Sequence, residues 1–268
     1  MRILTRRDTG LITNLTFGTA GSLFDADAQA FITAAGITDG TQQNAINTLV
    51  IALKNASVWS KLEAIYPMVG GTATTHKFNL KNPADTDAAY RLSFVGGWTH
   101  SANGAAGNGV NAFADTFWLS SQQNSASLSF YSRTNSDAVV HEFGAGLGPI
   151  SYMLLRFGNL FYGLVNSGTD NTVANTNSTG HYLLTRTASN VIKFFKNGGL
   201  TLNATTASTG NPTVNMVISA WRQAPGTLVR YSNRECAFAT LGTGLNDTES
   251  ANLYTAIQAF NTTLGRQV

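Results

Sequence analysis

The stretch 183–202, LLTRTASNVIKFFKNGGLTL, carries the strongest fold signal in this sequence. Residues 187–190 predict a turn between two strands. Asn197-Gly198 predicts a second turn, because this dipeptide readily adopts the backbone conformation of a two-residue hairpin loop. Consecutive strands joined by such short turns must pair antiparallel, since parallel neighbours need a long crossover connection. The stretch therefore indicates an antiparallel β-sheet.

The same two-residue periodicity begins at Tyr66 and continues through most of the chain. The candidate strands are rich in Val, Ile, Phe, Tyr and Thr and are bounded by Gly, Asn, Asp or Pro. They are residues 66–70, 76–80, 90–95, 110–118, 127–134, 138–143, 150–157, 160–166, 181–187, 190–196, 213–220, 227–232 and 234–241. Regular short strands without intervening helices predict an all-β fold, an antiparallel jelly-roll sandwich. The polar stretch 166–180 is expected to be a long loop.

Two helices are predicted before the strands. The first is indicated by apolar residues at helical spacing that begin behind Asp25 as N-cap and stop at Gly36. The second begins behind Thr38 or Asp39 as its cap. The apolar faces consist of Ala28, Phe31, Ile32 and Ala35 in the first helix and Ala45, Ile46, Leu49, Val50 and Leu53 in the second.

A further helix is predicted at the C-terminal end, because Asn246 and Glu249 have the spacing of a capping box. Its apolar stripe should dock on the sandwich. We therefore divide the sequence into an N-terminal arm (1–22), a helical pair (23–65) and a jelly-roll sandwich that includes the C-terminal helix (66–268).

The composition narrows the class of protein. The sequence has 268 residues, of which 12% are charged, about half the ~25% of typical globular domains. Its net charge is only +3, and the basic residues concentrate only near the N-terminus, so nucleic-acid binding is not indicated. The single Cys236 argues against a disulfide scaffold. No apolar run long enough to span a membrane and no signal peptide are recognised, so synthesis in a cytoplasm is expected.

Three stretches resemble the concanavalin A-like jelly roll in its laminin-G-like form. They are GNGVNAFADTF (107–117), HYLLTRTASNVIKFFKNGG (181–199) and ATLGTGLNDTESANLY (239–254). These stretches resemble, in order, a Gly/Asn turn that opens a strand, the hairpin of the family, and its last inner strand followed by a short helix. Relatives of this kind often hold a calcium ion near their loops, but its carboxylate ligands are not matched here, so no cofactor is predicted.

Residues 31–80 resemble the start of virion or tail-associated jelly-roll proteins of phages from Bacteroidetes-type hosts. The stretch reads FITAAGITDGTQQNAINTLVIALKNASVWSKLEAIYPMVGGTATTHKFNL. The resemblance implies a virion structural protein, such as a capsid fibre, decoration or tail-fibre component. It also implies contacts with other virion proteins through the N-terminal arm and a homo-oligomer, with a trimer favoured. The jelly-roll domain would face outward and contact host glycans.

The sequence lacks the residue patterns of most enzymes. Glycoside hydrolases on this fold need two carboxylates close together on one strand face. The glutamates are far apart in sequence: Glu63, Glu142, Glu235 and Glu249. Asp85 and Asp87 belong to a Pro-containing loop, and the four histidines form no zinc motif. We therefore predict a non-enzymatic protein, with a cryptic glycoside hydrolase as the last alternative.

A binding site is better supported, because sugar sites combine an aromatic platform with polar side chains on loops. The candidate ligand-binding residues are Trp98, His100, Asn103, Asp170 and Asn171. The first three belong to the glycine-rich segment 96–109, and the other two to the loop 166–180. The opposing interpretation places Trp98 in the core and makes its loop a mere connection. A free or cell-surface lectin-type carbohydrate-binding domain is accordingly the alternative function.

Two other residues with reactive side chains receive structural interpretations. His141 and Glu142 are adjacent in a predicted strand, so their side chains should point to opposite faces and form a surface pair. Cys236 lies between apolar neighbours in another predicted strand and is expected to be a small core residue.

Overall fold

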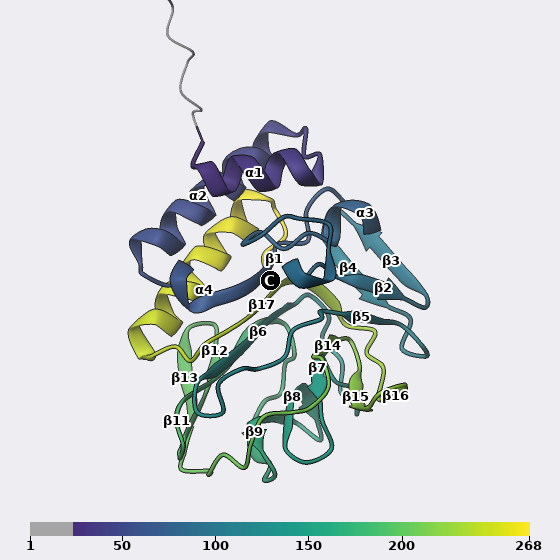
Figure 1. Cartoon of the computed structure of the whole chain (residues 1–268), viewed down its shortest axis with the longest axis vertical. Helices are drawn as coiled ribbons and strands as arrows, with labels where there is room; N and C mark the ends of the chain where they lie inside the picture. The colour runs from purple at the N-terminus through teal and green to yellow at the C-terminus, as the bar shows by residue number, and fades with distance from the viewer. Residues whose placement is uncertain (1–23) are drawn as a thin grey trace, which may run out of the picture.

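The computed structural model describes residues 24–268 (Figure 1). Its helices are α1 (Ala26–Ala35), α2 (Gly40–Asn55), α3 (Ala73–His76) and α4 (Asp247–Thr263), with two 3₁₀ turns, η1 (Trp59–Lys61) and η2 (Asp87–Ala89). The expected N-terminal arm, residues 1–22, lies outside the described residues. The division into an arm, a helical pair and a sandwich stays a prediction.

The first sheet contains the hairpin strands that decided the fold prediction. Its strands are β1 (Leu62–Tyr66), β3 (Trp98–Ser101), β4 (Gly104–Gly107), β6 (Ala126–Ser132), β11 (Gly180–Ala188), β12 (Val191–Lys196), β13 (Gly199–Ala204) and β17 (Glu235–Gly242). They are arranged in the order β13-β12-β11-β6-β17-β4-β3, and β1 also pairs with β17. Every pairing in this sheet is antiparallel.

The second sheet lies against the first. Its strands are β2 (Ser93–Val95), β5 (Phe113–Asp115), β7 (Phe143–Ala145), β8 (Ile150–Phe157), β9 (Leu160–Ser167), β10 (Asn171–Ala174), β14 (Val217–Ile218), β15 (Trp221–Ala224) and β16 (Thr227–Val229). The order is β10-β9-β8-β7-β14-β5-β2, with β15 and β16 attached beside β7. Only the short β15–β7 contact is parallel among the described pairs. Two antiparallel sheets and terminal helices confirm the predicted sandwich.

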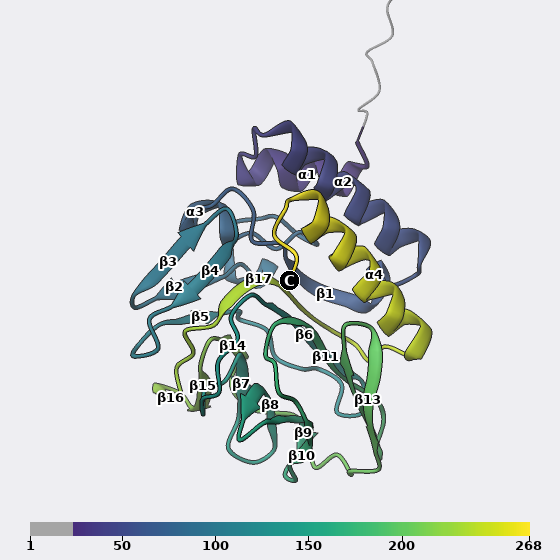
Figure 2. The same ribbon diagram turned by 180° about the vertical axis from the view of Figure 1, so that it is seen from behind.

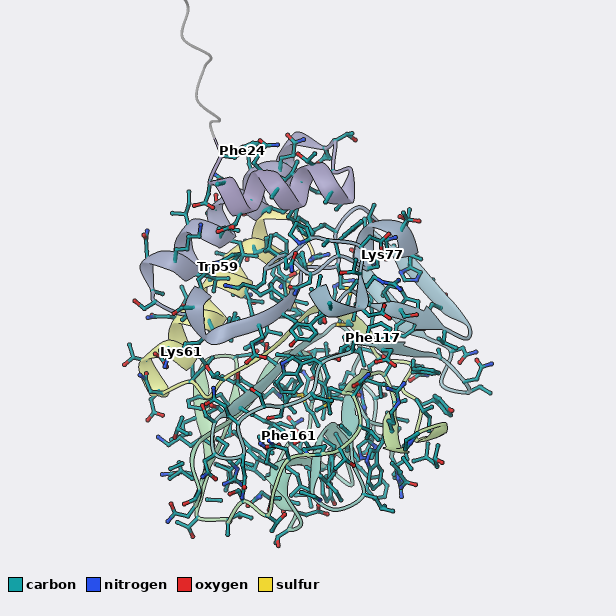
Figure 3. The ribbon with its side chains drawn as sticks, viewed as in Figure 1. Phe24, Trp59, Lys61, Lys77, Phe117 and Phe161 are labelled. Atoms are coloured by element: carbon teal, nitrogen blue, oxygen red, sulfur yellow. The ribbon has the colours of Figure 1, made fainter. Side chains whose placement is uncertain are left out.

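The helices, the first sheet and the second sheet form three layers, with a hydrophobic core between each neighbouring pair. The core between the sheets includes Phe130, Phe161 and Tyr182, each at most 1% exposed, and Figure 3 labels Phe161 in this interior. The other core lies between the helices and the outer face of the first sheet, where Phe31 and Phe238 are fully buried. Helices α1, α2 and α4 therefore lie on the side of the first sheet (Figures 1 and 2).

The decisive hairpins form where they were predicted. The β11–β12 turn consists of residues 189–190, within the predicted turn 187–190. Asn197 and Gly198 connect β12 to β13 and have positive φ angles of 48° and 75°. Asparagine and glycine tolerate this left-handed conformation better than other residues, and a two-residue turn of this kind matches the twist of its strands. Local sequence thus sets the register of three strands.

Arg186 links these hairpins to the second sheet. Its side chain is fully buried, and its Nε donates to the carbonyl of Val165 at 2.7 Å. Nη1 donates to the carbonyls of Ala188 and Ser189, at 3.2 and 2.9 Å. Because a buried guanidinium is costly unless its N–H groups are satisfied, these bonds hold the turn and the neighbouring sheet in place.

The helix boundaries agree with their predicted caps. Asp25 accepts a hydrogen bond from an N–H of the first turn of α1, and Gly36 ends that helix in the left-handed conformation. Asp39, rather than Thr38, is the N-cap of α2. Each cap satisfies a backbone group that the helix itself leaves without a partner. Local capping chemistry therefore determines where these helices begin and end.

Replacing Asn246 by alanine is expected to lower the free energy of unfolding by about 1 kcal/mol. The Asn246 side chain accepts from the backbone N–H of Glu249, and the Glu249 carboxylate accepts from the backbone N–H of Asn246, both at 2.9 Å. Urea unfolding measures the loss. Thr248→Ala, on the same exposed turn, is the control and should change stability little. Equal stability of Asn246→Ala and the wild type would contradict the prediction.

Some predicted strands are wrong or displaced, because a local cap or a distant partner strand decides the structure of the segment. Residues 76–80 are not a strand: α3 occupies Ala73–His76, where Thr72 and Thr75 form a capping box. The strand expected at 66–70 lies instead at Leu62–Tyr66, where it pairs with β17. Most of the segment 138–143 is not in a strand, since β7 begins at Phe143.

Two segments interpreted as loops contain strands. Residues 96–109 form the β3–β4 hairpin, although Gly and Ala dominate β4 and favour strands poorly. Residues 166–180 include β10, which pairs with β9. In both cases backbone pairing with a neighbouring strand overrides weak local propensity. Both segments contain the residues that the sequence suggested as a ligand-binding site.

Candidate functional site

A groove of about 380 Å³ opens on the outer face of the second sheet. It is lined by Val139, His141, Ile150, Tyr152, Leu154, Phe157, Tyr162, Asp170, Trp221 and Arg230. Most of these side chains are aromatic or aliphatic, and His141, Asp170 and Arg230 add an imidazole, a carboxylate and a guanidinium. The groove lies on the face of the second sheet that points away from the core between the sheets and from the helices.

Strand β8 creates the groove by carrying apolar side chains on both faces. Met153 and Leu155 point into the core between the sheets, whereas Tyr152 and Leu154 belong to a separate cluster on the outer face. On the neighbouring strand, Tyr162 lies directly opposite Leu154. An antiparallel strand whose outer face meets water normally alternates apolar and polar residues. Strand β8 departs from that alternation, because Tyr152 and Leu154 on its outer face are apolar in character and only 7% and 5% exposed.

Three rings form one wall of the groove. His141 stacks on Trp221 with ring centroids 5.2 Å apart, and Tyr152 meets the edge of His141 at 4.7 Å. The indole N–H of Trp221 donates to the carbonyl of Gly146 at 2.7 Å. Because its only polar atom is already bonded, Trp221 is fixed in orientation and offers ring surface to the groove.

Asp170 places a carboxylate beside these rings. The hydroxyl of Tyr152 donates to Asp170 Oδ1 at 2.8 Å. Burial, followed by this hydrogen bond, raises the pKa of Tyr152 far above its usual value, so the hydroxyl keeps its proton and remains a donor. A carboxylate has acceptor positions for about four hydrogen bonds. Asp170, an exposed residue, can therefore also accept from a bound hydroxyl group.

His141 and Arg230 supply the remaining polar groups of the groove. The His141 ring is buried, and its Nδ1 has no hydrogen-bond partner within residues 24–268. Burial, with lesser contributions from Arg230 and Arg234, lowers the pKa of His141 to about 3. The ring is accordingly neutral at physiological pH. Arg230 is exposed at the rim, so the groove combines apolar walls with one anion and one cation.

An ion pair lies buried beneath the groove. Arg234 Nη1 and Glu142 Oε1 are 2.6 Å apart, and both side chains are fully buried. Glu142 Oε2 also accepts from the backbone N–H of Leu155 on β8, at 2.9 Å. The prediction that His141 and Glu142 form a surface pair is therefore wrong, although their side chains do take different surroundings. Cys236, in contrast, is a fully buried core residue as predicted.

The structure does not bring the five sequence-predicted site residues together. Trp98 and His100 lie on β3, and Asn103 is exposed at the β3–β4 turn. Asp170 and Asn171 lie at β10, at one end of the second sheet. Strand β10 contacts β13, which lies at the opposite end of the first sheet from β3. Two separate edges of the sandwich therefore carry the two groups.

Only Asp170 of these five residues lines the groove. Trp98 is partly buried, and its indole N–H donates to the carbonyls of Val95 and Phe113, at 3.0 and 3.3 Å. Asn171 is 8% exposed, and its side-chain oxygen accepts from the hydroxyl of Thr206 at 2.6 Å. Both side chains are thus engaged by the protein itself.

The sequence interpretation missed the aromatic residues of the groove. Tyr152 and Tyr162 lie on strands that were predicted correctly, and the apolar character of both faces of β8 was the available signal. Trp221 and Arg230 offered no such signal, because β15 and the residue that follows β16 reach the groove only through the tertiary fold.

Metal and membrane features are not found in the described part of the chain. Within residues 24–268, no group of three or more His, Cys, Asp or Glu side chains could hold a metal ion. Among the same residues, no helix combines the length and apolar character that crossing a bilayer requires.

Comparison with known proteins identifies similar folds. No protein-family profile and no curated protein matches the sequence. A Trypanosoma rangeli sialidase in complex with 2,3-difluoro-KDN is 13% identical, with a TM-score of 0.53 over 79% of this chain and 39% of the sialidase. The binding domain of botulinum neurotoxin serotype D is 8% identical, with a TM-score of 0.50 over 74% of this chain and 52% of that domain. The likeness is one of β-sandwich folds, and this chain spans about two fifths to half of those proteins.

The comparison contradicts the prediction that the chain is not an enzyme, which is therefore wrong. That prediction relied on the absence of paired carboxylates and short catalytic motifs in the sequence. Proteins described as sialidases, including a mutant with trans-sialidase activity (12% identity, TM-score 0.51, over 80% of this chain and 39% of that one), share this fold. Missing local motifs consequently do not exclude an enzyme. None of these three similar structures is described as a virion protein.

Proposed function

We propose that this chain is a carbohydrate-binding β-sandwich and that the sugar occupies the aromatic groove of the second sheet. The observation that carries the proposal is the combination of Trp221, Tyr152 and Tyr162 with Asp170 in one cavity. Aromatic rings pack against the C–H face of a sugar, and a carboxylate accepts hydrogen bonds from its hydroxyls. Small-molecule sites typically have this composition, apolar walls with a few polar groups, and a volume of about 300 to 1,000 Å³.

The carboxylates of the groove bear on which glycosidase mechanism it could carry out. Within residues 24–268, Asp170 is the only carboxylate that lines it, whereas the two-carboxylate mechanism of most glycosidases needs a second one about 5 to 10 Å away. Glu142 lies beneath the groove, but its carboxylate is buried in the interior, where it binds Arg234 and the backbone N–H of Leu155. The sialidase and the toxin domain of similar fold support a carbohydrate-related role only through their names and their sandwich architecture.

Replacing Trp221 by alanine is expected to weaken glycan binding at least about tenfold, a loss of roughly 1.4 kcal/mol. A glycan array selects the ligand for the wild-type chain, and calorimetry then measures the affinity of each variant. Tyr162→Ala, on the opposite side of the groove, should give a similar loss without removing the Trp221–His141 stack. Removal of ring surface that contacts the sugar accounts for both effects.

Trp98→Ala is the matched control, because it removes a tryptophan from the site that the sequence suggested. It should leave the affinity unchanged. Loss of binding in Trp98→Ala with normal binding in both groove variants would place the sugar at β3 and overturn the proposal. An array on which the folded wild-type chain binds no glycan would also overturn it.

The location of the protein is a separate proposal. Residues 31–80 resemble the start of phage virion proteins, which supports a virion component whose groove faces host glycans and whose N-terminal arm contacts other virion proteins. Its oligomeric state, with a trimer favoured, also stays a prediction. Mass spectrometry of intact particles would detect the chain if the proposal is correct.

A further inference from the structure

We infer that the groove selects a carboxylated sugar and that Arg230 receives its carboxylate. The inference rests on the proposed function and names the class of its ligand. Among the described residues, Arg230 is the only basic one that lines the groove besides the neutral His141. Within the described chain, no hydrogen bond or ion pair engages its guanidinium. Beside its apolar walls and Asp170, the groove therefore presents one cation whose N–H donors have no partner among residues 24–268.

The backbone of Arg230 holds this cation at the rim. Its φ angle is 57°, in the left-handed region that residues other than glycine, asparagine and aspartate rarely adopt. The carbonyl of Arg230 accepts from the backbone N–H of His141 at 3.0 Å. Strain of this kind persists only where the surrounding structure imposes it, and it gathers at functional sites. The hydrogen bond between the two backbones connects Arg230 to His141, whose ring stacks on Trp221.

The two charged residues of the groove do not neutralise each other. No ion pair within residues 24–268 joins Arg230 to Asp170, which instead accepts from Tyr152. A sugar with both a carboxylate and hydroxyl groups would satisfy the two residues at once. Its carboxylate would meet Arg230, because Asp170 repels a negative charge, and its hydroxyls would meet Asp170. This charge arrangement fixes the orientation of the ligand as well as its class.

A carboxylate fits this groove better than a highly sulfated chain. Arginine forms two parallel hydrogen bonds with one carboxylate, which specifies a single anionic group. Polyanions, in contrast, are bound by runs or patches of basic residues, and only one arginine of the described part of the chain lines this groove. The ring that carries the carboxylate would pack on Trp221 or Tyr162, next to the arginine.

An array that carries each carboxylated glycan beside its methyl ester tests the inference. The ester keeps the shape of the sugar and removes its charge. Wild-type protein should bind the acid about tenfold more tightly than the ester, because charge-assisted hydrogen bonds are the stronger kind. Arg230→Gln should lose this preference while it still binds the ester, and Arg230→Lys should retain part of it. Lys61→Gln, which removes an exposed cation outside the groove, is the control and should behave as wild type.

Three results would overturn the inference. They are equal binding of acid and ester by the wild type, an Arg230→Gln variant that keeps the preference, and tighter binding of sulfated than of carboxylated glycans. In each case the protein still binds glycans, so the proposed function survives. Uronic and nonulosonic acids on the same array identify which carboxylated sugar is preferred.

Discussion

Arg234→Met is expected to lower the free energy of unfolding by about 3 to 5 kcal/mol, because it leaves the buried carboxylate of Glu142 without a cation. Neither side chain of this pair is exposed, and the two are 2.6 Å apart. Arg234 Nη2 also donates to the carbonyls of Ser136 and Arg156, at 2.9 and 3.0 Å. The substitution therefore leaves several buried polar groups without a hydrogen-bond partner at once. Urea unfolding followed by circular dichroism measures the loss.

Two further variants separate the buried charge from the general effect of losing an arginine. The double variant Glu142→Met with Arg234→Met should recover part of the stability, since an apolar pair carries no unpaired charge. Arg91→Gln breaks an exposed pair with Asp87 and should cost no more than about 1 kcal/mol. A single Arg234→Met variant as stable as Arg91→Gln would contradict the expectation.

The same variant should also weaken glycan binding, because the ion pair supports the floor of the groove. Glu142 accepts from the backbone N–H of Leu155, and Arg234 binds the carbonyl of Arg156. Both contacts lie on β8, the strand that carries Tyr152. Loss of the pair would shift the ring against which the sugar is proposed to lie.

The sequence was sufficient for the parts of the fold that depend on neighbouring residues. The caps Asp25 and Asn246 and the turn at Asn197-Gly198 act within a few residues, so their chemistry can be read locally. The long strands β8 and β11 carry enough side chains for their apolar character to stand out.

Short strands and the groove depend on contacts between distant segments. Strand β14 consists of two residues, Val217 and Ile218, held between β5 and β7, and no local pattern of that length can identify a strand. Trp221 reaches His141 only because β15 attaches beside β7. The same dependence affects the predicted site: Trp98 and Asp170 were grouped by residue type, while sheet order places them at separate edges. That these residues bind a ligand stays a prediction.

The protein is expected to lose stability steeply as the pH falls below about 6.5, because three buried histidines must become protonated when it unfolds in acid. Burial lowers the pKa of His76, His141 and His181 to about 3. Each folded-state pKa lies below the unfolded value, so the unfolded chain binds more protons and stability is lost as the pH falls from about 6.5 towards 3. Arg266 and His100 near His76, and Arg230 and Arg234 near His141, act in the same direction.

Once the pH is below the unfolded pKa of the histidines, the free energy of unfolding should fall by about 1.4 kcal/mol per pH unit for each histidine. For the three together the loss is about 4 kcal/mol per pH unit. Typical domains are stable by about 5 to 15 kcal/mol, so unfolding is expected before pH 4. Urea unfolding at pH 7, 6, 5 and 4.5, at constant ionic strength, measures this dependence. A free energy of unfolding that stays constant down to pH 4.5 would contradict it.

His181→Phe isolates one histidine. Both ring nitrogens of His181 are buried without a hydrogen-bond partner within residues 24–268, and the ring contacts Tyr254 at 6.0 Å between centroids. Phenylalanine preserves the ring contact and cannot be protonated, so stability at pH 7 should be equal or higher. The pH slope below 6 should decrease by about 1.4 kcal/mol per unit. Tyr254→Phe changes the same contact without removing a histidine and should keep the wild-type slope. If His181→Phe keeps that slope as well, His181 is not part of the acid sensitivity.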